Sequence, residues 1–168
     1  MKIREELLVE HSKRQAMKIV KYVGGDPLRF AELMAAFFAG PYRVTQRAAW
    51  PVSYCIEGHP ELVRPYLGRL ISILESSDGH SAVRRNVARL LQFVEIPPRM
   101  RARTYEACYD LVDDPQQPIA VRVFAMTVAA KAADGQPELK RELALVIGKY
   151  LNNGSAGFKA RARRVLKG

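Results

Sequence analysis

The chain has 168 residues, of which 48% are hydrophobic and 26% are charged, and its formal net charge is +10. This length fits one domain that buries a core of its own, and two cysteines, Cys55 and Cys108, are too few for a disulfide scaffold. No apolar run approaches the ~18–20 residues that cross a bilayer, and the charged N-terminal stretch is unlike a signal peptide. We therefore expect a cytoplasmic protein.

Apolar residues recur at spacings of three and four, between short clusters of Gly, Pro, Asp and Ser. This is the pattern of amphipathic helices separated by turns, and no stretch alternates in the manner of a strand. The pattern predicts an all-α protein of about nine helices, near residues 2–23, 27–39, 42–57, 60–76, 80–94, 98–112, 118–133, 137–152 and 156–167. Short connections predict that consecutive helices lie antiparallel and stack in pairs.

A repeat of 37 to 39 residues runs through the sequence. It is marked by arginines in similar segments, at Arg47, Arg84, Arg122 and Arg161. After each of the first three, a proline follows that opens the next helical pattern, at Pro60, Pro98 and Pro137. Proline at the first position of a helix loses no hydrogen bond, so these residues mark helix starts. A periodicity of this length indicates a stack of two-helix units.

A two-helix unit of this length resembles the HEAT repeat, whose second helix typically starts with Val-Arg and is preceded by an aspartate six residues before the arginine. Val83, Arg84 and Asp78 match this pattern, whereas the other repeats lack the aspartate. The resemblance implies a right-handed α-α superhelix in a single domain over residues 1–168. Its parts would be an N-terminal helix at 1–23 and repeats near 27–57, 60–94, 98–133 and 137–167. It also implies a scaffold role and carries no catalytic residues with it.

The recurring arginines have two interpretations. They either line a concave basic surface or bond to turn carboxylates and carbonyls of adjacent repeats. Under the first interpretation, the residues of the concave basic surface are Arg47, Arg84, Arg85, Arg89, Arg122, Arg161 and Arg164. A positive field of this kind favours encounters with acidic protein faces, nucleic acid or phosphates. We therefore expect a protein partner, with nucleic acid as the alternative, and no membrane partner.

Trp50, Tyr54 and Glu57 fall on one face of a predicted helix, around Pro51. An indole, a phenol and a carboxylate beside a basic surface resemble the active-site side chains of HEAT-like DNA-alkylation glycosylases, although no catalytic motif matches. The other interpretation is that Trp50 and Tyr54 pack in the core, with Glu57 at the helix end. These three residues are the predicted cleft of an alternative, glycosylase-like function.

No motif for catalysis by metal, nucleotide or covalent nucleophile is present in the sequence. The histidines share no ligand-like spacing, and there is no Walker, GxGxxG or GxSxG pattern. We expect no metal, no cofactor and no catalytic residue. The sequence thus predicts a binding module more readily than an enzyme.

Overall fold

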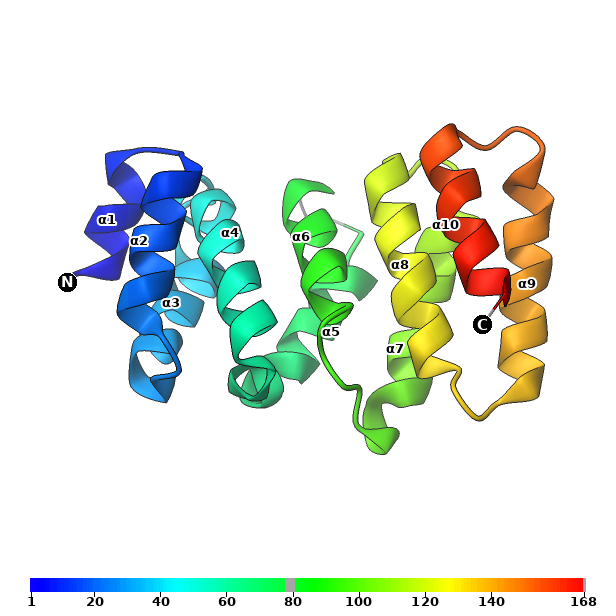
Figure 1. The fold of residues 1–168 in the computed structure, drawn as a ribbon, viewed down its shortest axis with the longest axis horizontal. Coiled ribbons are helices and arrows are strands. Elements are labelled where there is room, and N and C mark those ends of the chain that lie inside the picture. The colour runs from blue at the N-terminus through cyan, green and yellow to red at the C-terminus, as the bar shows by residue number, and fades with distance from the viewer. Residues whose placement is uncertain (78–80, 168) are drawn as a thin grey trace. The chain divides into compact units, whose positions relative to one another are not determined.

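The computed structural model describes residues 1–77 and 81–167. Within these residues the chain forms ten α-helices and one 3₁₀ helix, with no strand, which confirms the all-α prediction (Figure 1). The contacts divide the chain into two compact units, Met1–Leu67 and Gly68–Gly168.

The N-terminal unit contains α1 (Ile3–Val9), α2 (Lys13–Val23), α3 (Pro27–Ala39), α4 (Tyr42–Gly58) and the 3₁₀ helix η1 (Pro60–Tyr66). Helix α4 is its centre, because it packs against the other three α-helices and η1. The apolar faces of these helices enclose a core that includes Ile19, Phe30, Met34, Phe37 and Ile56. Burial of such faces, more than helix propensity, stabilises helices of this length.

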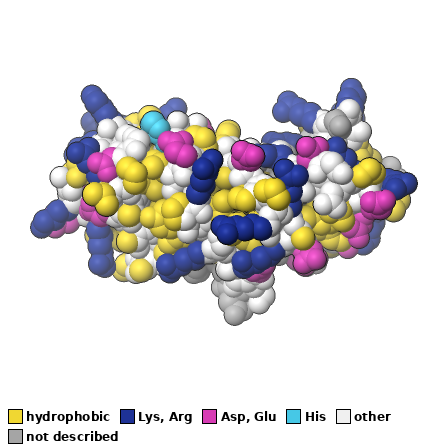
Figure 2. Space-filling model, turned by 90° about the horizontal axis from the view of Figure 1, so that it is seen from below, with side chains coloured by type: hydrophobic (Ala, Val, Ile, Leu, Met, Phe, Trp, Pro, Cys, Tyr) yellow, Lys and Arg dark blue, Asp and Glu magenta, His cyan; other side chains and the backbone are white. Residues whose placement is uncertain are grey.

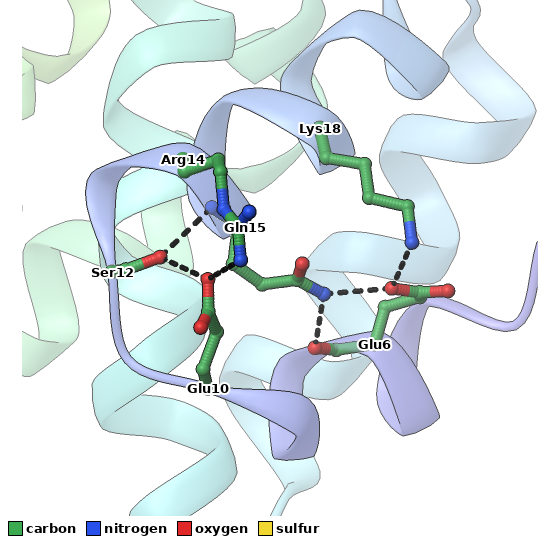
Figure 3. Close-up of polar contacts among 6 residues, drawn as sticks. All are labelled: Glu6, Glu10, Ser12, Arg14, Gln15 and Lys18. Atoms are coloured by element: carbon green, nitrogen blue, oxygen red, sulfur yellow. Dashed lines mark hydrogen bonds and ion pairs between the residues drawn. The ribbon is translucent and has the colours of Figure 1, made fainter.

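The first predicted helix, 2–23, is wrong as a single element, because it is broken between α1 and α2. Glu10 and Ser12 have extended backbone, and the Ser12 hydroxyl caps α2 by accepting a hydrogen bond from the Gln15 N–H at 3.1 Å. The Gln15 side chain then donates to the Glu6 carbonyl and carboxylate, both at 2.7 Å, which ties α2 to α1 (Figure 3). A serine at an N-cap satisfies an otherwise unpaired N–H, and this favours the break.

The C-terminal unit contains α5 (Leu67–Glu75), α6 (Ser81–Leu91), α7 (Pro98–Asp113), α8 (Ile119–Ala132), α9 (Pro137–Leu151) and α10 (Ala156–Lys167). Helix α8 packs against α6, α7, α9 and α10. This position explains why its sequence, IAVRVFAMTVAAKA, is apolar on nearly every side, since most of its faces contact other helices. The prolines Pro98 and Pro137 open α7 and α9, as the repeat predicted.

Candidate binding surface

Arg47, the first arginine of the repeat, bonds to main-chain oxygens of the N-terminal unit. Its guanidinium NH1 donates to the carbonyls of Leu7 at 3.1 Å and Leu8 at 3.0 Å, in the last turn of α1. The last carbonyls of a helix have no intrahelical donor, so they are ready acceptors for a cation. Arg47 therefore joins α4 to α1 and is half-buried in doing so.

Arg84 and Arg122 are buried in the C-terminal unit, with 5% and 9% of their surface exposed. Arg84 donates to the Ser76 carbonyl, directly after α5, and to the Gln117 side-chain oxygen at 3.0 Å. The expected pairing of Arg84 with Asp78 lies outside the described residues. Because a buried guanidinium does not meet a partner, both arginines are removed from the predicted basic surface.

Arg122 bonds to the main chain of α7 and contacts two aromatic rings. Its Nε and NH2 both donate to the Val112 carbonyl, at 3.0 and 2.7 Å, near the end of α7. The guanidinium also lies over the rings of Tyr150 and Phe158, 4.3 and 4.9 Å from their centroids. A cation over an aromatic face gains electrostatic attraction, and more so where water is excluded. Arg122 thus links α7, α8, α9 and α10.

Arg161 on α10 is half-buried and bonds to two neighbouring helical segments. Its NH1 donates to the side-chain oxygens of Gln92 and Thr127, each at 2.6 Å. Burial lowers the pKa of its guanidinium, and nearby Arg164 lowers it further.

All four recurring arginines therefore hold neighbouring segments together. Arg47, Arg84 and Arg122 bond to main-chain carbonyls, the acceptors that the second interpretation named, whereas Arg161 bonds to side-chain oxygens.

Arg85 and Arg164 are the predicted surface residues that are exposed. Arg89 is half-buried, and its guanidinium lies 5.9 Å from the centroid of the Phe93 ring. On the face shown in Figure 2, Lys and Arg side chains stand among hydrophobic and acidic side chains. Of the predicted surface set, the exposed cations are thus Arg85 on α6 and Arg164 on α10, which the repeat did not mark.

Trp50 lies at the surface of the N-terminal unit, with 36% of its area exposed, so the expectation that it packs in the core is wrong. Its indole stacks on the His11 ring at a centroid distance of 5.2 Å and an angle of 12°. Tyr54 is half-buried, and Glu57 is exposed in the last turn of α4. The cavity that touches Trp50 has a volume of about 10 Å³ and is not lined by Tyr54 or Glu57. A nucleobase does not fit there.

A larger cavity, of about 590 Å³, lies in the C-terminal unit and was missed by the sequence analysis. It is lined by Glu95, Ile96, Arg101, Thr127, Ala130, Lys131, Asp134, Lys140, Leu143, Ala144, Arg164, Val165 and Leu166. Its size falls in the range of sites that hold small ligands or anchoring side chains. One signal in the sequence pointed to it, namely the single lysine, Lys131, within the otherwise apolar second half of α8.

Lys131 is a half-buried cation in the lining of this cavity. Its Nζ donates to the carbonyls of Gln92 at 2.8 Å and Val94 at 2.7 Å. Burial lowers the pKa of its ammonium, and the charge of Glu95 opposes that effect. Lys140 pairs with Asp134 at 3.3 Å, so one cavity acid already has a cationic partner.

The described residues contain no group of three or more His, Cys, Asp or Glu side chains arranged to hold a metal ion. In the same part of the chain, no helix combines the length and the apolar character needed to span a membrane.

Comparisons with known proteins agree with this architecture. A designed armadillo repeat protein, solved in complex with the peptide (KR)4, matches with a TM-score of 0.63 and 16% sequence identity, over 98% of this chain and 79% of that one. No curated protein matches the sequence. A family model described as the HEAT repeat domain matches residues 3–168. With nearly its whole length matched, the chain belongs to the HEAT repeat family.

Proposed function

We propose that the chain is a non-enzymatic protein-binding module that presents the basic surface of its C-terminal unit to an acidic region of a partner protein. The observation that carries this proposal is the charge of residues 68–168, which hold 17 Lys and Arg against 10 Asp and Glu. Arg85 and Arg164 contribute exposed guanidinium groups to this surface. An excess of one sign raises the rate of encounter with a partner of the other sign.

The recurring arginines support a binding role indirectly. Because Arg84, Arg122 and Arg161 hold the helices of the C-terminal unit to one another, the exposed side chains are carried by a preordered frame. A partner that binds such a frame loses less free energy to ordering on association. Repeat proteins commonly use a rigid stacked surface in this way.

The designed armadillo neighbour is in complex with (KR)4, a peptide of alternating Lys and Arg. That complex supports peptide or protein binding as a use of this architecture. The net charge of +10 argues for the opposite partner charge here, because like charges across an interface cost binding free energy.

The test is recovery of a partner by the full-length chain with chemical crosslinking, followed by rebinding of the purified partner. We expect the Arg85→Glu/Arg164→Glu variant to lose about tenfold or more in affinity. The matched control is Arg4→Glu/Lys13→Glu, which makes the same charge change at exposed positions of the N-terminal unit. Equal affinity of both variants for the partner, or recovery of no crosslinked partner at all, would overturn the proposal.

Nucleic acid is the second candidate partner, favoured by α10, which contains five Lys and Arg and no Asp or Glu. Phosphate contacts by such residues release counterions, so binding to a labelled DNA duplex would fall steeply between about 50 and 200 mM salt. Binding that is absent or insensitive to salt removes this candidate. The glycosylase-like alternative has less support, because the cavity beside Trp50 is about 10 Å³.

A further inference from the structure

The cavity of the C-terminal unit lies where four helices and two connections meet. Its walls come from the first turn of α7, the second half of α8, the first half of α9 and the last turns of α10. The connections between α6 and α7 and between α8 and α9 complete them. Figure 1 shows α10 lying alongside α8 and α9, and α10 packs against both.

The lining of this cavity is apolar at its base and charged at its rim. Ile96 and Leu143 are buried, with 4% and 2% exposed, whereas Leu166 at the rim is 43% exposed. The apolar surface that is open to water comes from Leu166 and from half-buried Ala144 and Val165. Burying such surface against an apolar side chain is favourable by about 25 cal/mol per Å².

The cations at the rim outnumber the acids, with Arg101, Lys131, Lys140 and Arg164 against Glu95 and Asp134. Asp134 forms an ion pair with Lys140, and the charge of Glu95 acts against the burial that lowers the pKa of Lys131. Arg164 is exposed and donates no hydrogen bond to any residue in 1–77 or 81–167. An ammonium carries three N–H donors, and the two described acceptors of Lys131 use two of them. The rim therefore has donors left for a carboxylate.

We propose that this cavity is the docking site for a segment of the partner protein that carries a bulky apolar side chain next to Asp or Glu. The apolar side chain packs against Ala144, Val165 and Leu166, and the carboxylate meets Arg164 and Lys131 at the rim. This inference rests on the proposed function and names the part of the basic surface that gives it specificity. A buried anchor of this kind, surrounded by polar contacts, supplies most of the affinity in many interfaces.

The proposal is tested by selecting random twelve-residue peptides, displayed on phage, for binding to the full-length chain. We expect the enriched peptides to combine a large apolar residue with a neighbouring Asp or Glu. A synthetic peptide from the selection would then be titrated by fluorescence anisotropy. Ala144→Trp, which places an indole into the cavity, and Arg164→Glu, which reverses the rim charge, should each weaken its binding by about tenfold or more.

Each variant has a matched control outside the cavity. Ala160→Trp adds an indole at an exposed position of α10, and Arg163→Glu reverses the charge of the residue next to Arg164. Both controls should bind the peptide with less than a threefold change, and circular dichroism should show equal helicity in all four variants.

Three outcomes would overturn the proposal. The first is a selection that enriches basic peptides or no peptides. The second is peptide binding that the two cavity variants leave unchanged. The third is tight binding of dodecanoate, an apolar anion that is not a peptide, by a chain that binds no peptide. The second outcome leaves the protein-binding function standing, because peptides still bind but at a different place. If the Arg85→Glu/Arg164→Glu variant loses affinity and Ala144→Trp does not, the protein binds its partner through the basic surface but not through the cavity.

Discussion

Arg122 on α8 donates two hydrogen bonds to one backbone oxygen, the carbonyl of Val112, from Nε at 3.0 Å and from NH2 at 2.7 Å. Both residues are buried, so neither the carbonyl nor the guanidinium has water as a substitute partner. A buried polar group that loses its partner costs its full desolvation free energy.

Arg122→Met keeps an unbranched side chain and removes the donors. We expect it to lower the free energy of unfolding by about 2 kcal/mol, because the Val112 carbonyl is left unpaired. Urea unfolding followed by circular dichroism measures this change. The control Arg163→Met, at an exposed position of α10, should change the free energy by about 0.5 kcal/mol or less. Equal unfolding midpoints for the two variants would show that Arg122 is not a structural link.

The two cysteines are expected to be inert in the folded protein. Cys55 and Cys108 are buried, with 1% and 0% exposed, and burial raises the pKa of each thiol to about 12. Because the thiolate is the reactive form, neither should react with Ellman's reagent at pH 8, whereas both should react in guanidinium chloride. One equivalent of rapid reaction without denaturant would contradict the burial of that cysteine.

Acid should destabilise the protein in part through Asp113. A hydrogen bond from Lys149 at 2.8 Å, with a further one from the Tyr150 hydroxyl, lowers the pKa of this carboxyl below its ordinary value of 3.8. A lowered folded-state pKa means that the stabilisation is complete above the unfolded value and is lost as the pH falls through the folded value.

We therefore expect the Tm to fall between about pH 5 and pH 2, and to fall less steeply in Asp113→Asn. Thermal unfolding across this range gives both slopes. Asp110→Asn, an exposed change on the same helix, serves as the comparison and should follow the slope of the parent chain. A slope for Asp113→Asn that matches that of the parent would exclude this carboxyl as a contributor.

Trp50, the only tryptophan, reports on the N-terminal unit. Since 36% of it is exposed and His11 covers one face of the indole, acrylamide should quench its fluorescence in the folded protein. His11→Ala uncovers that face and should raise the Stern–Volmer constant, whereas His59→Ala should leave it unchanged. A constant near zero in the parent chain would place Trp50 in the core instead.

The helices were predictable from the sequence because prolines and glycine-rich turns mark their limits. Pro27, Pro98 and Pro137 each occupy the start of a helix, and α3 has the bounds that its pattern predicted. The break between α1 and α2 was missed because the apolar spacing continues through Ser12. The Ser12 hydroxyl caps the start of α2 and so favours a new helix there. Periodicity reports which face is buried and does not report a local change in backbone direction.

The candidate site was predicted less well. Recurrence pointed to Arg47, Arg84, Arg122 and Arg161, and all four bond within the fold. It did not identify which carbonyls accept from Arg47, Arg84 and Arg122, since a carbonyl has no signature in a sequence. The cavity beside Lys131 depends on how α7, α8, α9 and α10 pack against one another, which local sequence patterns do not report. Exposed Arg85 and Arg164 were predicted as surface residues, and they are on the surface.

The bonds of Arg47, Arg84 and Arg122 to main-chain oxygens have a consequence for how such a chain tolerates change. The acceptor belongs to the backbone, so replacing the side chain at Leu7, Ser76 or Val112 leaves the link available. Only the arginine is irreplaceable in each pair, and lysine lacks the planar pair of donors that Arg122 uses. The residue that supplies the carbonyl can therefore be substituted while the hydrogen bond between the two segments is kept.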